Sequence, residues 1–287
     1  MRFGLTTEGV RTLRLGDAGQ HYVEIAGTGW TLCPPDPIVR QRTGHYHDAA
    51  SAMALPERTE KSCHPELLLA LGEALNVEGP DAVLAIMWLA AGLAQVKAMP
   101  MLALVGPTAC GSTSLLRAAH RLIDPQQRAA RSLPTRPQKL RQSGLSRGRL
   151  ATYEERVPMK PPIAGELLAI LDDEWWPVAV RCFAGQAACP VPPDRRLDIH
   201  QRAIDAKRRL TTNELDIVLS DVAPKTLGLL LDLAVAGLAR AMETRPATLP
   251  RSADFYAFGV AAESLLWPPG TFAAAWAAME VRRQHAG

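Results

Sequence analysis

Residues 101–125 read MLALVGPTACGSTSLLRAAHRLIDP, and this stretch decides the expected fold. The apolar run 101–105 predicts a buried strand. The amphipathic run 114–123 predicts a helix that stops at Asp124-Pro125. A strand followed by a tight glycine-bearing loop and a helix is one unit of an α/β fold.

The loop between strand and helix has the spacing of a nucleotide-binding phosphate loop. Gly106 and Gly111 are separated by four residues, and Thr113 follows two positions later. The pattern G-x-x-x-x-G-x-[ST] matches that loop except that Ser112 stands where a lysine is expected. In such loops the backbone N–H groups hold phosphate and the Ser/Thr hydroxyl binds Mg²⁺. The alternative is a chance glycine pair between a strand and a helix.

The missing lysine has a definite physical cost. One cation about 4 Å from a phosphate charge, at an effective dielectric constant of about 20, contributes roughly 4 kcal/mol before desolvation. Phosphoryl transfer depends on positioning and charge stabilisation. We therefore expect the neutral Ser112 to impair turnover more than binding. Ala109 also occupies a position where glycine is common in these loops, and its Cβ restricts close approach of a phosphate.

Composition sets the broad class. The chain has 287 residues, 47% hydrophobic and 21% charged, with a net charge of +3. Five widely spaced cysteines argue against a disulfide framework. The N-terminus lacks an apolar signal core, and the longest apolar run, 82–96, is short for a membrane span. We expect a cytoplasmic protein that does not enter a membrane.

The chain divides into three expected parts. Residues 1–64 form an N-terminal β cap, with short strands near 12–15, 21–25 and 30–32, and a connecting arm. Residues 65–205 form an α/β core with helices at 65–75, 80–97 and 163–171 and a strand at 178–183. Residues 206–287 form a C-terminal helical subdomain, with helices at 212–219, 224–242, 252–265 and 271–283.

A basic run occupies residues 126–150 and contains no acidic residue. Irregularly spaced arginine and lysine favour contact with phosphates over reading of bases. The predicted nucleic-acid contacts are Arg128, Arg131, Arg136, Lys139, Arg141, Arg147 and Arg149. The alternative is a solvated arginine-rich surface. A second basic stretch, 195–209, is diluted by aspartates and is interpreted as ordinary surface.

Several longer segments resemble one family. Residues 104–125, 131–134, 207–215, 227–232, 249–255 and 267–272 are similar, in order, to P-loop ATPases of the AAA+ class related to superfamily-3-type helicases of actinobacterial phages and mobile elements. The resemblance covers about residues 20–283. It implies a P-loop AAA+-like core that binds ATP and Mg²⁺ and assembles with neighbouring subunits.

The chain departs from that family around the nucleotide. Glu154, beside Glu155, stands where the resemblance implies an Asp-Asn pair, and residues 172–177 replace a longer sensor segment. The resemblance leaves Arg195 as a candidate for the arginine that reaches a neighbour's phosphate.

These observations predict a degenerate site made of Gly106, Gly111, Ser112, Thr113, Glu154 and Arg195. We expect no catalytic residues and no cofactor beyond residual ATP and Mg²⁺. The expected function is a pseudo-ATPase acting as a binding or scaffold subunit, with a protein partner or oligomer and nucleic acid bound through 126–150. The alternative is a divergent but active ATPase or helicase subunit. His45, His47 and His64 lack a metal-binding pattern, so no metal site is expected.

Overall fold

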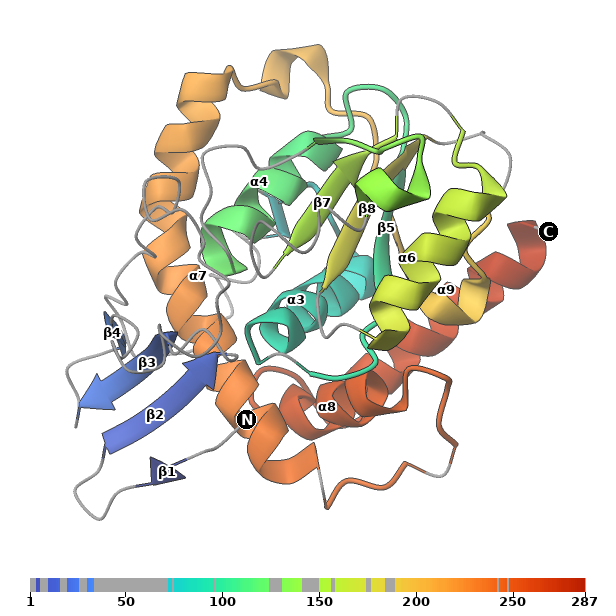
Figure 1. Ribbon diagram of the computed structural model, residues 1–287. Coiled ribbons are helices and arrows are strands. Elements are labelled where there is room, and N and C mark those ends of the chain that lie inside the picture. The colour runs from blue at the N-terminus through green and yellow to red at the C-terminus, as the bar shows by residue number, and fades with distance from the viewer. Residues whose placement is uncertain are drawn as a thin grey trace.

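A computed structural model shows an α/β fold (Figure 1). It describes residues 4–5, 10–15, 20–25, 30–33, 72–73, 75–94, 96–123, 131–140, 150–155, 158–173, 177–183, 189–241, 243–246 and 248–286. Most of the predicted connecting arm, the three histidines of the metal alternative, and Arg128, Arg141, Arg147 and Arg149 lie outside these residues.

The main sheet has five parallel strands. They are β5 (Met101–Gly106), β6 (Arg131–Ser132), β7 (Ala151–Glu154), β8 (Val178–Phe183) and β9 (Arg196–His200), arranged in the order β6-β7-β8-β5-β9. The predicted strands 101–105 and 178–183 are confirmed. β6 and β9 were not predicted, because β6 has two residues and the charged residues of β9 were assigned to a basic surface stretch.

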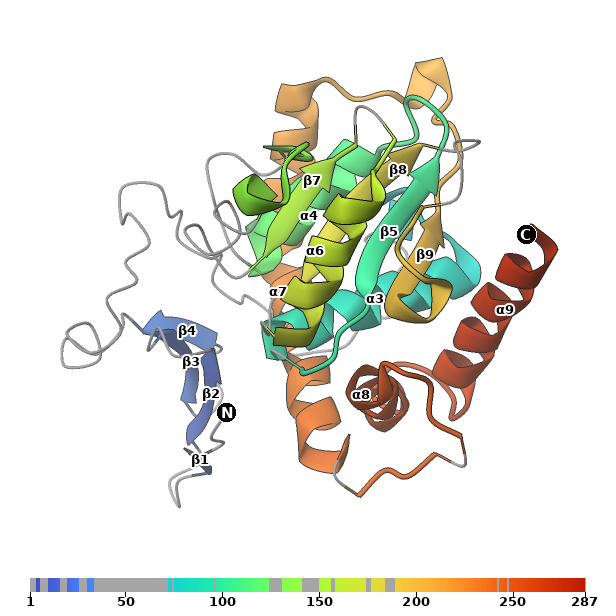
Figure 2. The same ribbon diagram turned by 45° about the vertical axis from the view of Figure 1, so that its right-hand side comes forward.

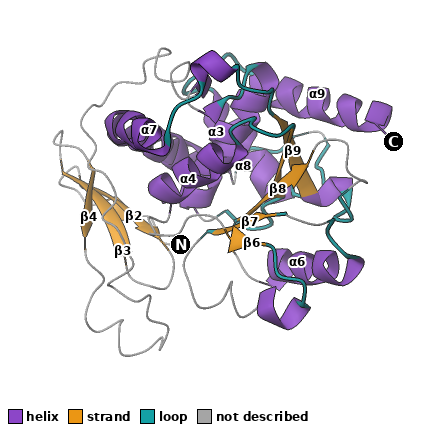
Figure 3. Ribbon diagram, turned by 90° about the horizontal axis from the view of Figure 1, so that it is seen from above, coloured by secondary structure: helices purple, strands orange, loops and turns teal. Residues whose placement is uncertain are grey.

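Helices cover both faces of this sheet. Alternate residues of β5 belong to different cores, because successive strand side chains point to opposite faces. Leu102 and Leu104 pack with α3 (Gly79–Ala94), α4 (Ser112–Ile123) and α7 (Thr212–Ala241), whereas Met101 and Ala103 pack with α6 (Pro161–Asp173). Figures 2 and 3 show the strands between α6 on one side and α3 and α4 on the other.

The C-terminal helices share the larger of these two cores. The helices α8 (Ala253–Glu263) and α9 (Thr271–Ala286) pack against α7 and α3 through Phe255, Phe272 and Trp276, all of which are buried. The predicted helices in this part of the chain are present. The expected break at Pro224 is wrong, since α7 runs through the proline. Pro224 removes one backbone bond, at a cost of about 3 kcal/mol, which the buried residues on either side offset.

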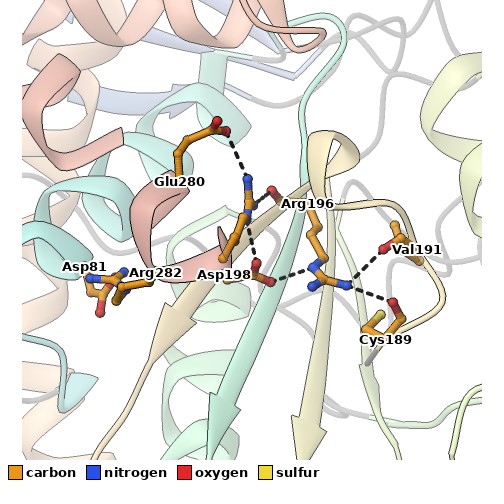
Figure 4. A network of polar contacts seen from close by, with 8 residues as sticks. Asp81, Cys189, Val191, Arg196, Asp198, Glu280 and Arg282 are labelled. Atoms are coloured by element: carbon orange, nitrogen blue, oxygen red, sulfur yellow. Dashed lines mark hydrogen bonds and ion pairs between the residues drawn. The ribbon is translucent and has the colours of Figure 1, made fainter. Parts of the chain in front are cut away.

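A polar network covers the outer edge of β9 (Figure 4). Asp198 pairs with Arg196 at 2.8 Å and with Arg283 of α9 at 2.7 Å, and Arg283 also donates to the backbone oxygen of Arg196. A free sheet edge exposes unpaired backbone groups. The arginine of α9 therefore protects this edge and ties the last helix to the sheet.

The N-terminal residues form a separate antiparallel sheet. Its strands are β1 (Gly4–Leu5), β2 (Val10–Leu15), β3 (Gln20–Ile25) and β4 (Trp30–Cys33), in sequence order. This confirms the three strands predicted from the sequence and adds β1.

One helix in the described part of the chain, α7, has the length and apolar composition of a membrane span. Of the apolar window in that helix, 56% is buried inside the protein. A core helix passes the same test, so this feature is weak evidence for a membrane.

Candidate functional site

The loop after β5 lies at a switch in the sheet connections. The helix α4 leads from β5 toward β6 at one edge of the sheet, whereas the strand on the other side of β5 is β9, which follows β8. In open parallel sheets, ligands bind outside the carboxyl ends of the strands at such a point. The topology therefore makes residues 107–111 the expected ligand-binding position.

Two residues of this loop have left-handed backbone conformations. Ala109 has φ 64° and Gly111 has φ 86°. Turns with left-handed residues present successive N–H groups to one side, which creates anion-binding concavities. The loop then enters α4, whose first N–H groups have no partners within the helix. Its backbone is thus suited to an anion, with Ala109 bearing steric strain that a glycine would avoid.

Contacts from two distant segments fix the loop. Asn76 donates its side-chain amide to the backbone oxygen of Cys110 at 2.8 Å and to that of Arg202 at 2.6 Å. Gln201 donates from its backbone N–H to Val105 O at 2.8 Å and from its side chain to Leu75 O at 2.8 Å. These bonds join residues 75–76, the loop and the end of β9 into one unit.

The residue in the lysine position points into the protein. Ser112 is buried, and its Oγ lies 2.8 Å from the Sγ of Cys110, which is buried beneath the loop. A Cβ added to Gly106 would lie 2.7 Å from that same sulfur and 2.8 Å from Gln201 O. The space below the loop is therefore filled by protein atoms, and Gly106 is required by close approach.

The predicted hydroxyl and carboxylate meet beside the loop. Thr113, in the first turn of α4, donates its Oγ1 to Oε1 of Glu154 at 2.7 Å, across 41 residues of sequence. Glu154 ends β7, so both oxygens lie at the carboxyl edge of the sheet. Oxygen donors of this kind suit Mg²⁺, which usually keeps several waters and takes one or two carboxylates with substrate phosphates.

The second acidic residue turns the other way. Glu155 is buried, and its Oε1 accepts the backbone N–H of Met159 at 2.7 Å. The predicted acidic pair therefore has two separate environments, because successive strand residues face opposite sides. Glu154 makes the described contact with α4, through Thr113.

Two cysteines lie on the side of Glu155. A hydrogen bond from the thiol of Cys182 lowers the pKa of Cys189 to about 7, with help from the Val191 backbone and from Arg196, while burial opposes the shift. The same hydrogen bond to Cys189, for which Cys182 must keep its proton, raises the pKa of Cys182 above its usual range, and burial adds to this shift.

Arg195 is not brought to the loop. The next residue, Arg196, pairs in register with Met101 at the start of β5, so Arg195 lies at the amino-terminal edge of the sheet. Five residues of strand, about 17 Å, separate that level from Gly106. Arg195 is also buried and ion-paired with Asp172.

Of the predicted nucleic-acid contacts, three are described. Arg131 begins β6, whereas Arg136 and Lys139 are exposed on the segment that follows this strand. Because the strands are parallel, this segment leaves the sheet at the same edge as the loop 107–111.

Sequence reasoning missed Asn76, Cys110 and Gln201. Asn76 carried one usable signal in the sequence, because asparagine is enriched at left-handed backbone positions. The structure gives Asn76 such a conformation, with φ 51°. Gln201 had none, because its role depends on the end of a strand that was not predicted.

No family model matches the chain, and no curated protein matches it. Among solved structures, the chain is similar to one described as the A form apo structure of the NrS-1 C-terminal region. The two share 11% identity with a TM-score of 0.46, over 78% of this chain and 67% of that one. A likeness at this level carries no argument about function.

Proposed function

We propose that the chain binds the phosphate groups of a nucleotide at residues 106–113 and hydrolyses it poorly or not at all. The observation that carries the proposal is the 2.7 Å contact between Thr113 and Glu154 beside a loop with left-handed residues at a sheet switch point. These groups would hold Mg²⁺ with the phosphates. Bound Mg²⁺ would neutralise phosphate charge, which the described residues of the loop do not.

Ser112 supports the absence of efficient turnover. It is neutral and buried against Cys110. Phosphoryl transfer is driven by charge stabilisation of the transition state, so the loss falls mainly on catalysis. In line with the sequence resemblance, the chain would serve as a binding or scaffold subunit in a replication- or defence-type assembly of a mobile element.

Calorimetric titration with ATP, with and without Mg²⁺, tests this proposal. We expect measurable affinity that falls about tenfold in Thr113→Val and in Glu154→Gln, because each removes one oxygen ligand of the metal. Glu243→Gln and Thr244→Val make the same chemical changes after the far end of α7 and serve as controls. Absence of binding by the wild type would reject the proposal.

Turnover separates this proposal from the active-ATPase alternative. We expect no steady phosphate release from the wild type. Steady hydrolysis by the wild type that is abolished by Thr113→Ala would establish an active enzyme instead.

We also propose that nucleic acid contacts the same edge of the sheet. The support is the exposure of Arg136 and Lys139 next to the strand ends. Binding to single-stranded DNA should be independent of sequence, should weaken with salt, and should fall in the double variant Arg136→Ala/Lys139→Ala. Unchanged affinity in that variant would remove these residues from the interface.

A further inference from the structure

The segment after β9 runs directly beside the phosphate loop. The backbone N–H of Ile204 donates to Ala109 O at 3.1 Å, and the Ile204 side chain would lie 3.1 Å from a Cβ added to Gly111. Asn76 bridges the Cys110 and Arg202 backbones from below. Residues 202–204 are thus held against the residues that would face a bound phosphate.

Two cations follow this anchor within a short helical turn. The turn η2 (Ala206–Arg208) is capped by Asp205, whose carboxylate accepts the Lys207 N–H at 2.9 Å. Lys207 and Arg208 are exposed, and in the part of the chain that the structure describes neither makes an ion pair.

The neighbouring arginines differ from this pair. Arg202 forms an ion pair with Glu78 at 3.4 Å, and Arg209 donates its Nε to Ile204 O at 3.3 Å. In this described segment, Lys207 and Arg208 are therefore the cations whose side chains make no hydrogen bond or ion pair with the protein.

The distance from the anchor permits contact with such a ligand. Lys207 is three residues beyond Ile204, and three residues span at most about 11 Å. The lysine ammonium sits on a flexible four-carbon stem and the arginine presents a five-donor fork. This short tether permits both groups to approach residues 107–111, since Ile204 already contacts Ala109 in that loop.

We propose that Lys207 and Arg208 supply to the bound phosphates the positive charge that Ser112 does not. The inference rests on the nucleotide-binding function proposed above and names the residues that compensate for its missing lysine. Because these cations are exposed, their attraction is screened by salt. They would stabilise a bound triphosphate without the fixed placement that catalysis needs, which agrees with binding in the absence of turnover.

The test compares Mg·ATP affinity of the wild type with that of Lys207→Ala/Arg208→Ala. We expect the double variant to bind about tenfold more weakly in low salt, with a smaller difference in 0.5 M salt. The control, Lys97→Ala/Arg245→Ala, removes the same charge elsewhere: Lys97 precedes β5 at the amino-terminal edge and Arg245 follows the end of α7. It should leave affinity within about twofold of the wild type.

Two further measurements make the outcome specific to charge. Lys207→Arg/Arg208→Lys keeps both charges and should retain affinity. A melting temperature unchanged by the alanine pair, measured without nucleotide, would show that the segment still folds.

The outcomes distinguish this inference from the proposed function. If the wild type binds Mg·ATP and the alanine pair binds equally well, the compensating role is overturned while nucleotide binding stands. Equal losses in the alanine pair and the control pair would also overturn it, because net charge alone would then explain the effect. If the wild type binds no Mg·ATP, both proposals fail together.

Discussion

Ala109 offers a test of the loop conformation that is independent of any ligand. A non-glycine residue with φ 64° carries about 1–2 kcal/mol of steric strain from its Cβ. Replacement by glycine removes that strain but adds about 0.4–1 kcal/mol of unfolded-state entropy. The balance predicts that Ala109→Gly stabilises the fold by about 1 kcal/mol, or about 2–4 °C in melting temperature.

Two other alanines provide matched controls for this substitution. Ala98 has φ 51° in a turn before β5, away from the loop, so Ala98→Gly should give a similar gain. Ala277 is exposed in the middle of α9, where glycine loses the helix propensity of alanine, so Ala277→Gly should cost about 1 kcal/mol. Chemical denaturation with urea measures all three free energies of unfolding.

The signs of these three free-energy changes test the left-handed conformation of the loop. A gain for Ala98→Gly with a loss for Ala109→Gly would refute the left-handed conformation of the loop. The anion-binding argument would then lose its backbone basis. A gain at both turns with a loss in α9 is the pattern that the structure requires.

Three further predictions concern packing, capping and thiol chemistry. Gly237→Ala places a Cβ 2.4 Å from the ring of Phe258 in α8 and should destabilise the fold by about 1–3 kcal/mol. Gly165→Ala adds a Cβ in open space on α6 and should stabilise the fold by about 0.5–1 kcal/mol. Urea denaturation measures both free energies of unfolding. Glu263→Ala leaves two N–H donors of the α9 entry without the carboxylate that accepts them at 2.6 and 2.7 Å, and should lower the free energy of unfolding by about 2–3 kcal/mol. The rate at which iodoacetamide labels Cys189 should rise with pH and reach its midpoint near the Cys189 pKa of about 7, because the thiolate is the nucleophile. In Cys182→Ala, mass spectrometry should show that midpoint moved toward pH 9.0. A midpoint unchanged by the variant would exclude the thiol–thiol contact.

The elements around the loop were predictable because they are long and strongly patterned. The strand at 101–106 is a continuous apolar run, the strand at 178–183 is apolar except for Arg181, and α4 has a clear amphipathic period. Thr113 entered the predicted site through the loop spacing and Glu154 through the family resemblance, but their contact was not predicted, because no local pattern joins residues 41 positions apart.

The missed strand β9 explains why the position of Arg195 in the fold was not predicted. Residues 196–200, RLDIH, alternate polar and apolar side chains, which is a strand pattern, but their charges suggested a surface patch. In the fold, Asp198 is shared by Arg196 and by Arg283 of α9, and Arg283 also pairs with Glu280. Recognition of that strand would have placed Arg195 at its amino-terminal end, away from the loop.

Side-chain contacts beneath the loop hold its conformation without a lysine. Cys110, Ser112 and Gln201 fill and bind the underside of the loop with side chains of the protein itself. Such a loop is preorganised before any ligand arrives, so less ordering entropy is lost on binding. A lysine contributes charge to the ligand and little to this network, and its loss leaves the backbone cradle intact. On the function proposed above, binding would persist at reduced affinity without turnover, because turnover requires a fixed charge at the developing transition state.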